Sequence, residues 1–473
     1  MGGAAAFFDL DRTLLAGASG PVITAELRAA GLLTAPAIPG TDLLFRAFNA
    51  VGETRPAMAL TRRAARLAAG WRRSEAQEVG KRVADRLVDE VQPFARILAE
   101  EHQAAGRKVV IATTTPDDLV RPLAERLGFD DVVATRYGER GGAYDGTIDG
   151  ECVWGRGKLR ATRDWAERND VSLDESWAYS DSYYDVPLLS AVGHPTAVNP
   201  DPRLRVVATM RRWPVRYLDV PEGVVKLAGR EPQELLFPFA RPELVPFADI
   251  RIAGTGNIPE TSPGIVVANH RSYFDPMVLG YVVAERGRPV RGLGKKEVFD
   301  APVVGQIAKA VGGIRVERGT GSDEPLKAAA EALEAGDLVV ILPQGTIPRG
   351  RAFFEPELQG RWGAARLAQM TGAPVVPIGL WGTEKVWPRS SRVPNVFNVL
   401  DPPVVSATVG PPVQLCYANA DDDTTRIMSA IVDLLPPEAR ERREPTAEEL
   451  VLTLPPGYEG DPDHEAERRP GTD

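Results

Sequence analysis

The sequence predicts an α/β protein with two domains, each built around a mostly parallel sheet. Short β-branched runs alternate with longer amphipathic segments along almost the whole chain, which is typical of parallel strands joined by helices. A Pro-, Arg- and aromatic-rich stretch at 211–223, RRWPVRYLDVPEG, interrupts this alternation and predicts the domain boundary. At 473 residues the chain is long enough for about three domains of ordinary size.

The expected strands are short apolar runs. In the first half they are AAAFFDL, KVVIATT, DDVVATR and SWAYS, and in the second half GIVVAN, PVRGLG, GGIRVE, DLVVILP and PVVPIGL. Between Gly20 and Val91 the sequence contains no convincing strand but several helical patterns. This stretch therefore predicts an all-helical insertion after the first strand.

Composition narrows the class of protein. The 43% apolar and 26% charged residues are those of an ordinary globular protein, and a net charge of −9 argues against a nucleic-acid binder. Two distant cysteines, Cys152 and Cys416, offer neither a disulfide framework nor a zinc cluster, so we expect a reducing, cytoplasmic setting. We expect no signal peptide and no membrane span, which leaves only peripheral membrane contact.

Polar residues follow the strands of the first half. Asp9 and Asp11, in FFDLDRT, lie two apart at the end of an apolar run and point the same way if the backbone is extended. Two crowded carboxylates repel each other, a cost that a divalent cation removes. The alternative is a strand followed by a helix cap, with Asp11 or Thr13 as the capping residue.

Later strand ends favour the first interpretation. They supply a hydroxyl at Thr113, a cation at Lys158 near a helix start, and two more acids at Asp181 and Asp185. This set suits the binding of Mg²⁺ and a phosphate while a carboxylate attacks phosphorus.

In this order the residues resemble the haloacid dehalogenase-like phosphatases, in particular the phosphoserine phosphatase-like subgroup with a helical cap. The resemblance covers about residues 4–212. It implies that Asp9 is the nucleophile, Asp11 the general acid and base, and Thr113 and Lys158 the phosphoryl-binding residues. It also implies that Asp9, the Asp11 carbonyl and Asp181 bind Mg²⁺, supported by Asp185. Arg12 is a departure, since many members have glycine there.

The second half contains NHRSYFDP at 269–276, with His270 five residues before Asp275. Asp275 followed by Pro276 is a common helix start, and His270 can be an ordinary turn residue. Residues five apart do not share a helix face, so the two side chains meet only if a loop carrying His270 folds back over the helix start. Asp275 would then fix the imidazole tautomer and leave Nε2 free as a base.

Four blocks in order resemble the glycerolipid acyltransferases of the 1-acylglycerol-3-phosphate acyltransferase family, over about residues 240–400. They are NHRSYFDP, GLGKKEVFDAP with GGIRVERG, ILPQGTIPRG and PVVPIGLWG. The resemblance implies that His270 deprotonates an acceptor hydroxyl, which attacks an acyl thioester, while Asp275 orients the ring. It further implies substrate-binding roles for Arg318 and for the third block, with Gln344, Gly345, Thr346 and Arg349.

The third block departs from the family pattern P-E-G-T-R. Gln344 replaces its glutamate, and Ile347 replaces its arginine and cannot bind phosphate. Arg349 or Arg351 can take over that contact if the loop bends back. The departure therefore affects the prediction of which lipid is the acceptor more than the prediction that the domain transfers acyl groups.

We therefore expect an α/β chain with a doubly wound parallel sheet and helical cap, followed by an α/β glycerolipid acyltransferase domain. The predicted segments are 1–212 for the phosphatase domain with its cap at about 16–92, 213–239 for a linker or interfacial segment, 240–435 for the acyltransferase domain and 436–473 for a disordered acidic tail. The expected partners are acyl-coenzyme A or acyl-carrier protein, a lysophospholipid, a phosphomonoester and Mg²⁺, at the inner face of the cell membrane. The alternatives are a phosphatase with a degenerate lipid-binding half, or a membrane-surface scaffold.

Overall fold

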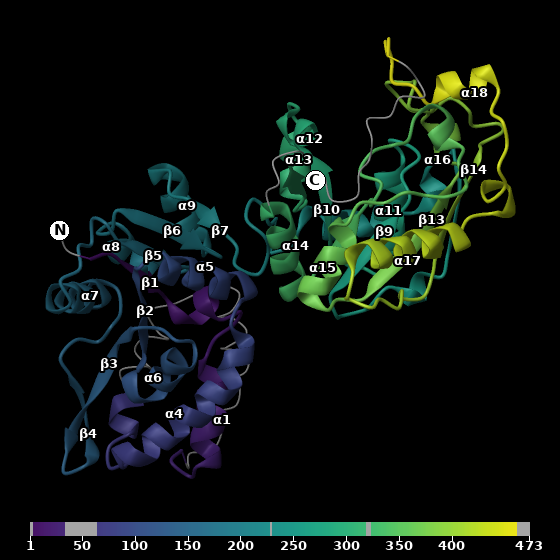
Figure 1. The fold of residues 1–473 in the computed structure, drawn as a ribbon. Coiled ribbons are helices and arrows are strands. Elements are labelled where there is room, and N and C mark those ends of the chain that lie inside the picture. The colour runs from purple at the N-terminus through teal and green to yellow at the C-terminus, as the bar shows by residue number, and fades with distance from the viewer. Residues whose placement is uncertain (1–2, 34–63, 228, 318–322, 461–473) are drawn as a thin grey trace. The chain divides into compact units, whose positions relative to one another are not determined.

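The computed structural model describes residues 3–33, 64–227, 229–317 and 323–460 and divides into two compact units, Met1–Glu222 and Gly223–Asp473 (Figure 1). Each unit contains its own seven-stranded sheet, and most neighbouring strands are parallel. The predicted α/β class with two sheets is confirmed.

The sheet of the first unit has the order β4-β3-β2-β1-β5-β6-β7, and only the β3–β4 pair is antiparallel. All four residues of β1 are buried, as expected for a strand covered on both faces. The chain continues to β2 on one side of β1 and to β5 on the other, so the carboxyl end of β1 is the kind of switch point where α/β sheets bind ligands. The strands are β1 Ala5–Phe8, β2 Lys108–Pro116, β3 Asp131–Arg140, β4 Ala143–Asp149, β5 Trp177–Ser180, β6 His194–Val198 and β7 Val215–Arg216.

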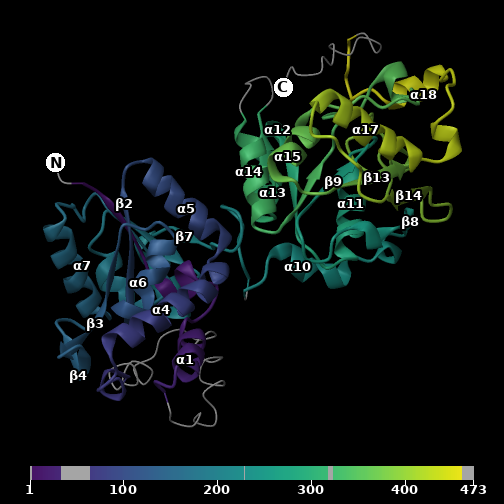
Figure 2. The same ribbon diagram turned by 60° about the horizontal axis from the view of Figure 1, so that its bottom comes forward.

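Helices cover both faces of this sheet. The core on one face contains side chains of α4, α5 and α6, and the core on the other contains side chains of α7, α8 and α9. Helices α1 and α4 belong to the predicted helical insertion, and α4 packs beside α6 (Figure 2). The helices are α1 Gly20–Ala29, α4 Arg73–Leu87, α5 Pro93–Ala104, α6 Asp117–Arg126, α7 Arg156–Arg168, α8 Val186–Leu189 and α9 Pro202–Arg211.

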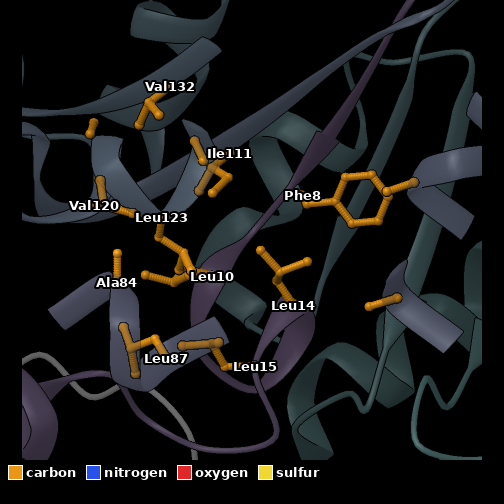
Figure 3. Packing of buried hydrophobic residues seen from close by; sticks show 14 of the residues in the cluster. Phe8, Leu10, Leu14, Leu15, Ala84, Leu87, Ile111, Val120, Leu123 and Val132 are labelled. Carbon is orange, nitrogen blue, oxygen red and sulfur yellow. The ribbon is translucent and has the colours of Figure 1, made fainter. Parts of the chain in front are cut away.

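The turn that follows β1 is fixed by apolar packing. Leu10, Leu14 and Leu15 are fully buried and lie among side chains of α4, α6 and β2 (Figure 3). Backbone bonds close the turn, from Leu14 N to Asp9 O at 3.2 Å and from Leu15 N to Leu10 O at 2.9 Å. The polar residues between these leucines are therefore fixed at the carboxyl end of β1.

The sheet of the second unit has the order β11-β10-β12-β9-β13-β14-β8, with β13–β14 antiparallel. β9 lies in the middle and is buried throughout, and the chain continues to β10 on one side of it and later to β13 on the other. Its strands are β8 Asp249–Ala253, β9 Gly264–Ala268, β10 Val290–Lys295, β11 Ile314–Val316, β12 Leu338–Ile341, β13 Val375–Trp381 and β14 Val404–Val409.

In the second unit, α11 covers one face of the sheet, and α14, α15 and α17 cover the other. The helices are α10 Pro232–Leu236, α11 Asp275–Ala284, α12 Lys296–Asp300, α13 Val304–Ala310, α14 Glu324–Glu334, α15 Gly363–Thr371, α16 Thr383–Val386, α17 Ala420–Asp433 and α18 Ala447–Leu452. No helix within the described ranges is long and apolar enough to cross a bilayer.

The segment predicted as a linker, 213–239, is instead divided between the units. β7 pairs with β6, and Leu218 is buried in the core of the first unit. Glu231 belongs to the second unit, where its carboxylate binds the buried Arg291 guanidinium at 2.5 and 2.8 Å. Trp213 and Tyr217 therefore flank β7, the strand that completes the first sheet.

The prediction of a disordered tail over 436–473 is wrong for residues 436–460. Thr446 and Glu449 form a capping box that starts α18, and Thr453 Oγ1 accepts a buried bond from Gly350 N at 2.9 Å. The charges that suggested disorder are paired, as in Arg443 with Glu449 at 2.8 Å. The rest of the predicted tail lies outside the described residues.

Candidate active sites

Three predicted residues of the first unit meet at the carboxyl end of β1. Lys158 Nζ, from α7, donates to Asp9 Oδ1 at 2.8 Å and to Asp185 Oδ2 at 2.5 Å. Lys158 is 3% exposed and Asp185 1%, so the contacts lie away from water. A buried ammonium between two carboxylates balances charges that would otherwise be expensive to bury.

Asp181 follows β5, the strand that pairs with β1. Its Oδ2 lies 3.4 Å from Arg12 Nε, in an ion pair that joins the turn after β1 to the end of β5. Arg12 adopts a left-handed backbone conformation, with φ of 58°. Glycine adopts that conformation without strain, which explains why glycine suits this position and why arginine there needs a compensating contact.

Asp11 has an environment unlike that of Asp9. Ser19 N donates to Asp11 Oδ1 at 2.6 Å. Burial raises the pKa of the Asp11 carboxyl above its usual value, and this effect outweighs the hydrogen bond from Ser19, which lowers it. A raised pKa favours the protonated form, which a general acid requires.

Thr113 is buried near the end of β2, next to β1 in the sheet. Its Oγ1 lies 3.2 Å from the Thr115 hydroxyl and accepts a bond from Thr115 N. The strand register is irregular between Thr113 and Pro116, so the regular ladder ends where the hydroxyl lies. The predicted acids, lysine and threonine thus all occupy the same edge of the sheet.

His270 and Asp275 meet in the second unit, as the loop argument predicts. His270 Nδ1 lies 2.7 Å from Asp275 Oδ2, just beyond β9. The same oxygen accepts from Arg271 N at 2.6 Å and Ser272 N at 2.8 Å, and Asp275 is fully buried. An ionised carboxylate only accepts hydrogen bonds, so the pairing favours a ring with its proton on Nδ1 and a free lone pair on Nε2.

The third block contacts this loop. Gln344 Oε1 accepts from His270 N at 2.6 Å, and Gln344 is buried. Gly345 follows with a positive φ of 71°, which turns the chain so that Thr346 Oγ1 lies 3.4 Å from Lys295 Nζ. Gln344 therefore accepts this hydrogen bond through a neutral amide, at the position where the family pattern has a charged glutamate.

Of the two arginines predicted for substrate binding, the structure describes one, Arg349. The Arg349 guanidinium stacks on the Tyr458 ring at 4.9 Å, in the segment that was predicted to be disordered. Arg318 lies outside the described residues. Ile347 is buried, and Arg389 donates to its carbonyl oxygen.

Comparisons with known proteins match both halves. The model of haloacid dehalogenase-like hydrolases matches residues 6–190. A Streptomyces azureus protein named for inhibition of morphological differentiation is 38% identical over 259 residues, covering 53% of this chain and 89% of its own length. The chain belongs to the haloacid dehalogenase-like hydrolase family. Phosphoserine phosphatase SerB1 of Mycobacterium tuberculosis is 35% identical over 216 residues, which cover 45% of this chain and 70% of the relative.

The acyltransferase family model matches residues 249–381, so the chain joins an acyltransferase domain to the hydrolase domain. Among solved structures, a Bordetella pertussis protein of unknown function covers 46% of this chain and 100% of its own, with 30% identity and a TM-score of 0.41. The Thermotoga maritima 1-acyl-sn-glycerophosphate acyltransferase covers 45% of this chain and 81% of its own, with 21% identity and a TM-score of 0.34.

The donor atoms of the hydrolase domain suit a hard divalent cation. Asp9, Asp181 and Asp185 offer carboxylate oxygens, the ligands that Mg²⁺ prefers. Asp185 Oδ1 is buried and has no hydrogen-bond partner in the structure, as expected of an atom that serves a cation. No group of three or more such ligands within the described ranges is already arranged as a metal cluster. In this structure Arg12 and Lys158 provide positive charge among the carboxylates.

Two residues of the acyltransferase domain were missed by the sequence argument. Lys295 lies beside Thr346, and Arg271 stacks between the Phe353 and Trp381 rings at 4.2 Å each. Arg271 also pairs with Glu384 at 3.1 Å. For Lys295, the lysine pair in GLGKKE was a signal visible in the sequence. For Arg271 there was no local signal, because its partners come from segments that are distant in sequence.

Proposed function

We propose that this chain is a bifunctional enzyme of phospholipid synthesis. The acyltransferase domain moves an acyl chain from acyl-coenzyme A or acyl-carrier protein to a lysophospholipid such as 1-acylglycerol-3-phosphate. The hydrolase domain is a Mg²⁺-dependent phosphomonoester hydrolase. The observation that carries the acyltransferase proposal is the 2.7 Å contact between His270 Nδ1 and Asp275 at the carboxyl end of β9.

Acyl transfer follows from this geometry. His270 Nε2 takes the proton of the acceptor hydroxyl as its oxygen bonds to the thioester carbonyl carbon. The carbon–sulfur bond then breaks, and the leaving thiolate receives the proton from the imidazolium. Asp275 stabilises the imidazolium and keeps the ring in place. A positioned base of this kind typically contributes about 10²–10⁴-fold in rate.

In the hydrolase domain, each residue of the site has a separate role in phosphoryl transfer. The Asp9 carboxylate attacks phosphorus, and the alcohol leaves with a proton from Asp11. Water then attacks the phosphorus of the aspartyl-phosphate and gives a proton back to Asp11. This step breaks the bond between phosphorus and the Asp9 oxygen, so phosphate is released and the Asp9 carboxylate is restored. Lys158 and Thr113 bind phosphoryl oxygens. Bound Mg²⁺, held by Asp9, Asp181 and the Asp11 carbonyl with Asp185 in support, would neutralise the charge of the phosphoryl group.

The identity of the acceptor depends on the third block. Ile347 removes the cation of the family pattern, and the Arg349 side chain lies against Tyr458. Lys295, which lies beside Thr346, is a cation at this turn, and it supports an anionic acceptor headgroup. Phosphoserine, after the named M. tuberculosis relative, is the first phosphomonoester to assay.

We place the enzyme in the cytoplasm at the inner face of the cell membrane, in peripheral contact with lipid. The support is chemical, since acyl-chain substrates reside in bilayers and the second unit exposes Leu236, Phe239 and Leu244 near Arg241.

A phosphatase with a degenerate lipid-binding half is the second candidate, favoured by Gln344 and Ile347. A panel of lysolipids with labelled acyl-coenzyme A and labelled acyl-carrier protein separates the two. Under our proposal the wild type acylates at least one acceptor, and His270→Ala abolishes this while Asp9→Asn does not. Wild type inactive with every acceptor and both donor classes supports the second candidate.

A further inference from the structure

A long loop without helix or strand connects α16 to β14, from Trp387 to Pro403. It exceeds the length of about 12–15 residues above which such loops are usually functional. The base of the loop is well held. Trp387 Nε1 donates to Ser391 O at 3.0 Å, and Asn395 N donates to Val386 O at 2.9 Å. The loop therefore has a defined position on the acyltransferase domain.

The tip of this loop presents a cluster of apolar side chains to solvent. Phe397 is 90% exposed and Leu400 is 98% exposed. Val393, Val396 and Val399 are exposed as well. Single exposed apolar residues are normal, but a cluster within eight consecutive positions is the kind of patch that marks an interaction surface.

The base of the loop contacts the loop that carries His270. Ser272 Oγ donates to Trp387 O at 2.6 Å, and the rings of Tyr273 and Trp387 lie 5.8 Å apart. Tyr273 and Met277, on the α11 side of this contact, are also exposed. The loop is thus anchored on the segment that carries the candidate base, and this segment exposes Tyr273 and Met277 as well.

We propose that residues 393–400 insert into the surface of an anionic lipid bilayer and bring the His270 site to its lipid substrate. The charges match this partner, since Lys385 and Arg392 are exposed and Asp401 is the one acid between 388 and 403. Cations beside an inserted apolar segment strengthen binding to anionic lipid. The proposal rests on the acyltransferase function and names the surface that it uses.

The test is vesicle flotation of the full chain with phosphatidylcholine and phosphatidylglycerol at 3:1. We expect Phe397→Asp/Leu400→Asp to weaken partition into vesicles at least tenfold. The matched control is Val206→Asp/Met210→Asp on α9, where the side chains are 58% and 80% exposed, and it should float like wild type. Both pairs are surface residues, so unchanged melting temperatures will show that each variant folds.

Acyl-transfer activity provides a second test of the loop. The loop variant should lose acyl transfer to an acceptor embedded in vesicles at least tenfold while retaining it with the same acceptor dispersed as monomers. Equal flotation of wild type and loop variant overturns the proposal. So does a loop-dependent change in molecular mass without lipid, which would show that the loop covers protein. Flotation needs no catalysis, so the loop proposal stands on that arm even if no acyl transfer is found and the function proposal falls.

Discussion

Asp275 binds three N–H groups through one carboxylate oxygen, those of the His270 ring, Arg271 and Ser272. The residue is not acting as an ordinary cap for the amides of α11, because the N-cap of that helix is Phe274 and the second Asp275 oxygen, Oδ1, has no hydrogen-bond partner. Its contacts run backward to the loop that precedes it. The helix-start interpretation of Asp-Pro and the catalytic interpretation are therefore distinguishable, and the geometry favours the catalytic one.

Asp275→Asn tests this orienting role. An amide can present its NH₂ group to Nδ1 and select the wrong tautomer, so we expect kcat for acyl transfer to fall roughly 10²–10⁴-fold. An unchanged melting temperature of the acyltransferase domain serves as the control for folding. A variant with the kcat of wild type would show that the carboxylate is not needed to orient His270.

The Arg12–Asp181 ion pair predicts an effect on metal binding. Arg12→Gly removes a cation 3.4 Å from a candidate Mg²⁺ ligand and relieves the left-handed strain. We expect calorimetry to show a Mg²⁺ Kd lower by about tenfold, while Arg12→Lys remains near wild type. Weaker Mg²⁺ binding in the glycine variant would contradict the idea that the Arg12 guanidinium competes with Mg²⁺ for Asp181. It would indicate that Arg12 supports the metal site.

His102 links pH to the stability of the hydrolase domain. Burial lowers the pKa of His102 to about 4 in the folded chain, where Arg107 and Tyr179 bond its two ring nitrogens at 2.7 and 2.8 Å. The unfolded chain takes up a proton near pH 6.5. The stabilisation is thus present above pH 6.5 and is lost as pH falls toward 4.

From the shift to about 4 we expect this group to reduce the free energy of unfolding by about 3 kcal/mol between pH 7 and pH 4. Urea denaturation of wild type and His102→Gln at several pH values measures the difference. The variant should be less stable at pH 7 and less sensitive to acid. Parallel pH curves for the two proteins would rule out His102 as the titrating group.

The site residues that could be predicted from the sequence are those that directly follow buried strands. An apolar run that ends in Asp or His shows where the strand stops and which polar side chain lies at its end. Asp9, Lys158 and Asp185 meet as expected, and so do His270 and Asp275. The ion pair of Arg12 and the contact of Lys295 with Thr346 depend on how separate segments approach each other, which local patterns do not encode.

Among elements, the segment at 446–458 has the clearest consequence for the acyltransferase site. Thr453 accepts from Gly350 N, and Leu452 O accepts from Ser390 N at 3.2 Å. Tyr458 stacks on Arg349 in the same region. The segment therefore holds the loop that follows Gln344, the residue whose side chain contacts the His270 backbone.

Thr453→Val tests this support. It keeps the shape of the side chain but leaves the buried Gly350 N–H without its acceptor, at a cost of about 1–3 kcal/mol. We expect a lower melting temperature of the acyltransferase domain and a higher KM for the acceptor, with the KM for the acyl donor unchanged. Thr453→Ser restores the hydroxyl and should behave as wild type. Equal acceptor KM values for all three would limit the segment to a structural role.

The elements best predicted from sequence were buried central strands and long amphipathic helices. β1 and β9 are continuous apolar runs because both of their faces are covered. β7 has only two residues and β14 lies toward the sheet edge beside β8, so neither has a strong pattern. α18 was missed because a charged composition was given more weight than its capping box.

For the whole molecule, the central feature is two complete α/β units in one chain, each with cores on both faces of its sheet. Each candidate site lies at the carboxyl end of the central strand of its own sheet and draws its described residues from one unit. The two chemistries should therefore be separable by single substitutions. The order of the domains along the chain was predictable, because each half has its own set of motifs.

The most direct measurement is the rate of acyl transfer by wild type, His270→Gln and Asp9→Asn under saturating donor and acceptor. We predict a loss of at least 10²-fold in the His270 variant, no change in the Asp9 variant, and the reverse pattern for phosphate release. Acyl transfer that persists at the wild-type rate without the His270 imidazole would contradict this prediction.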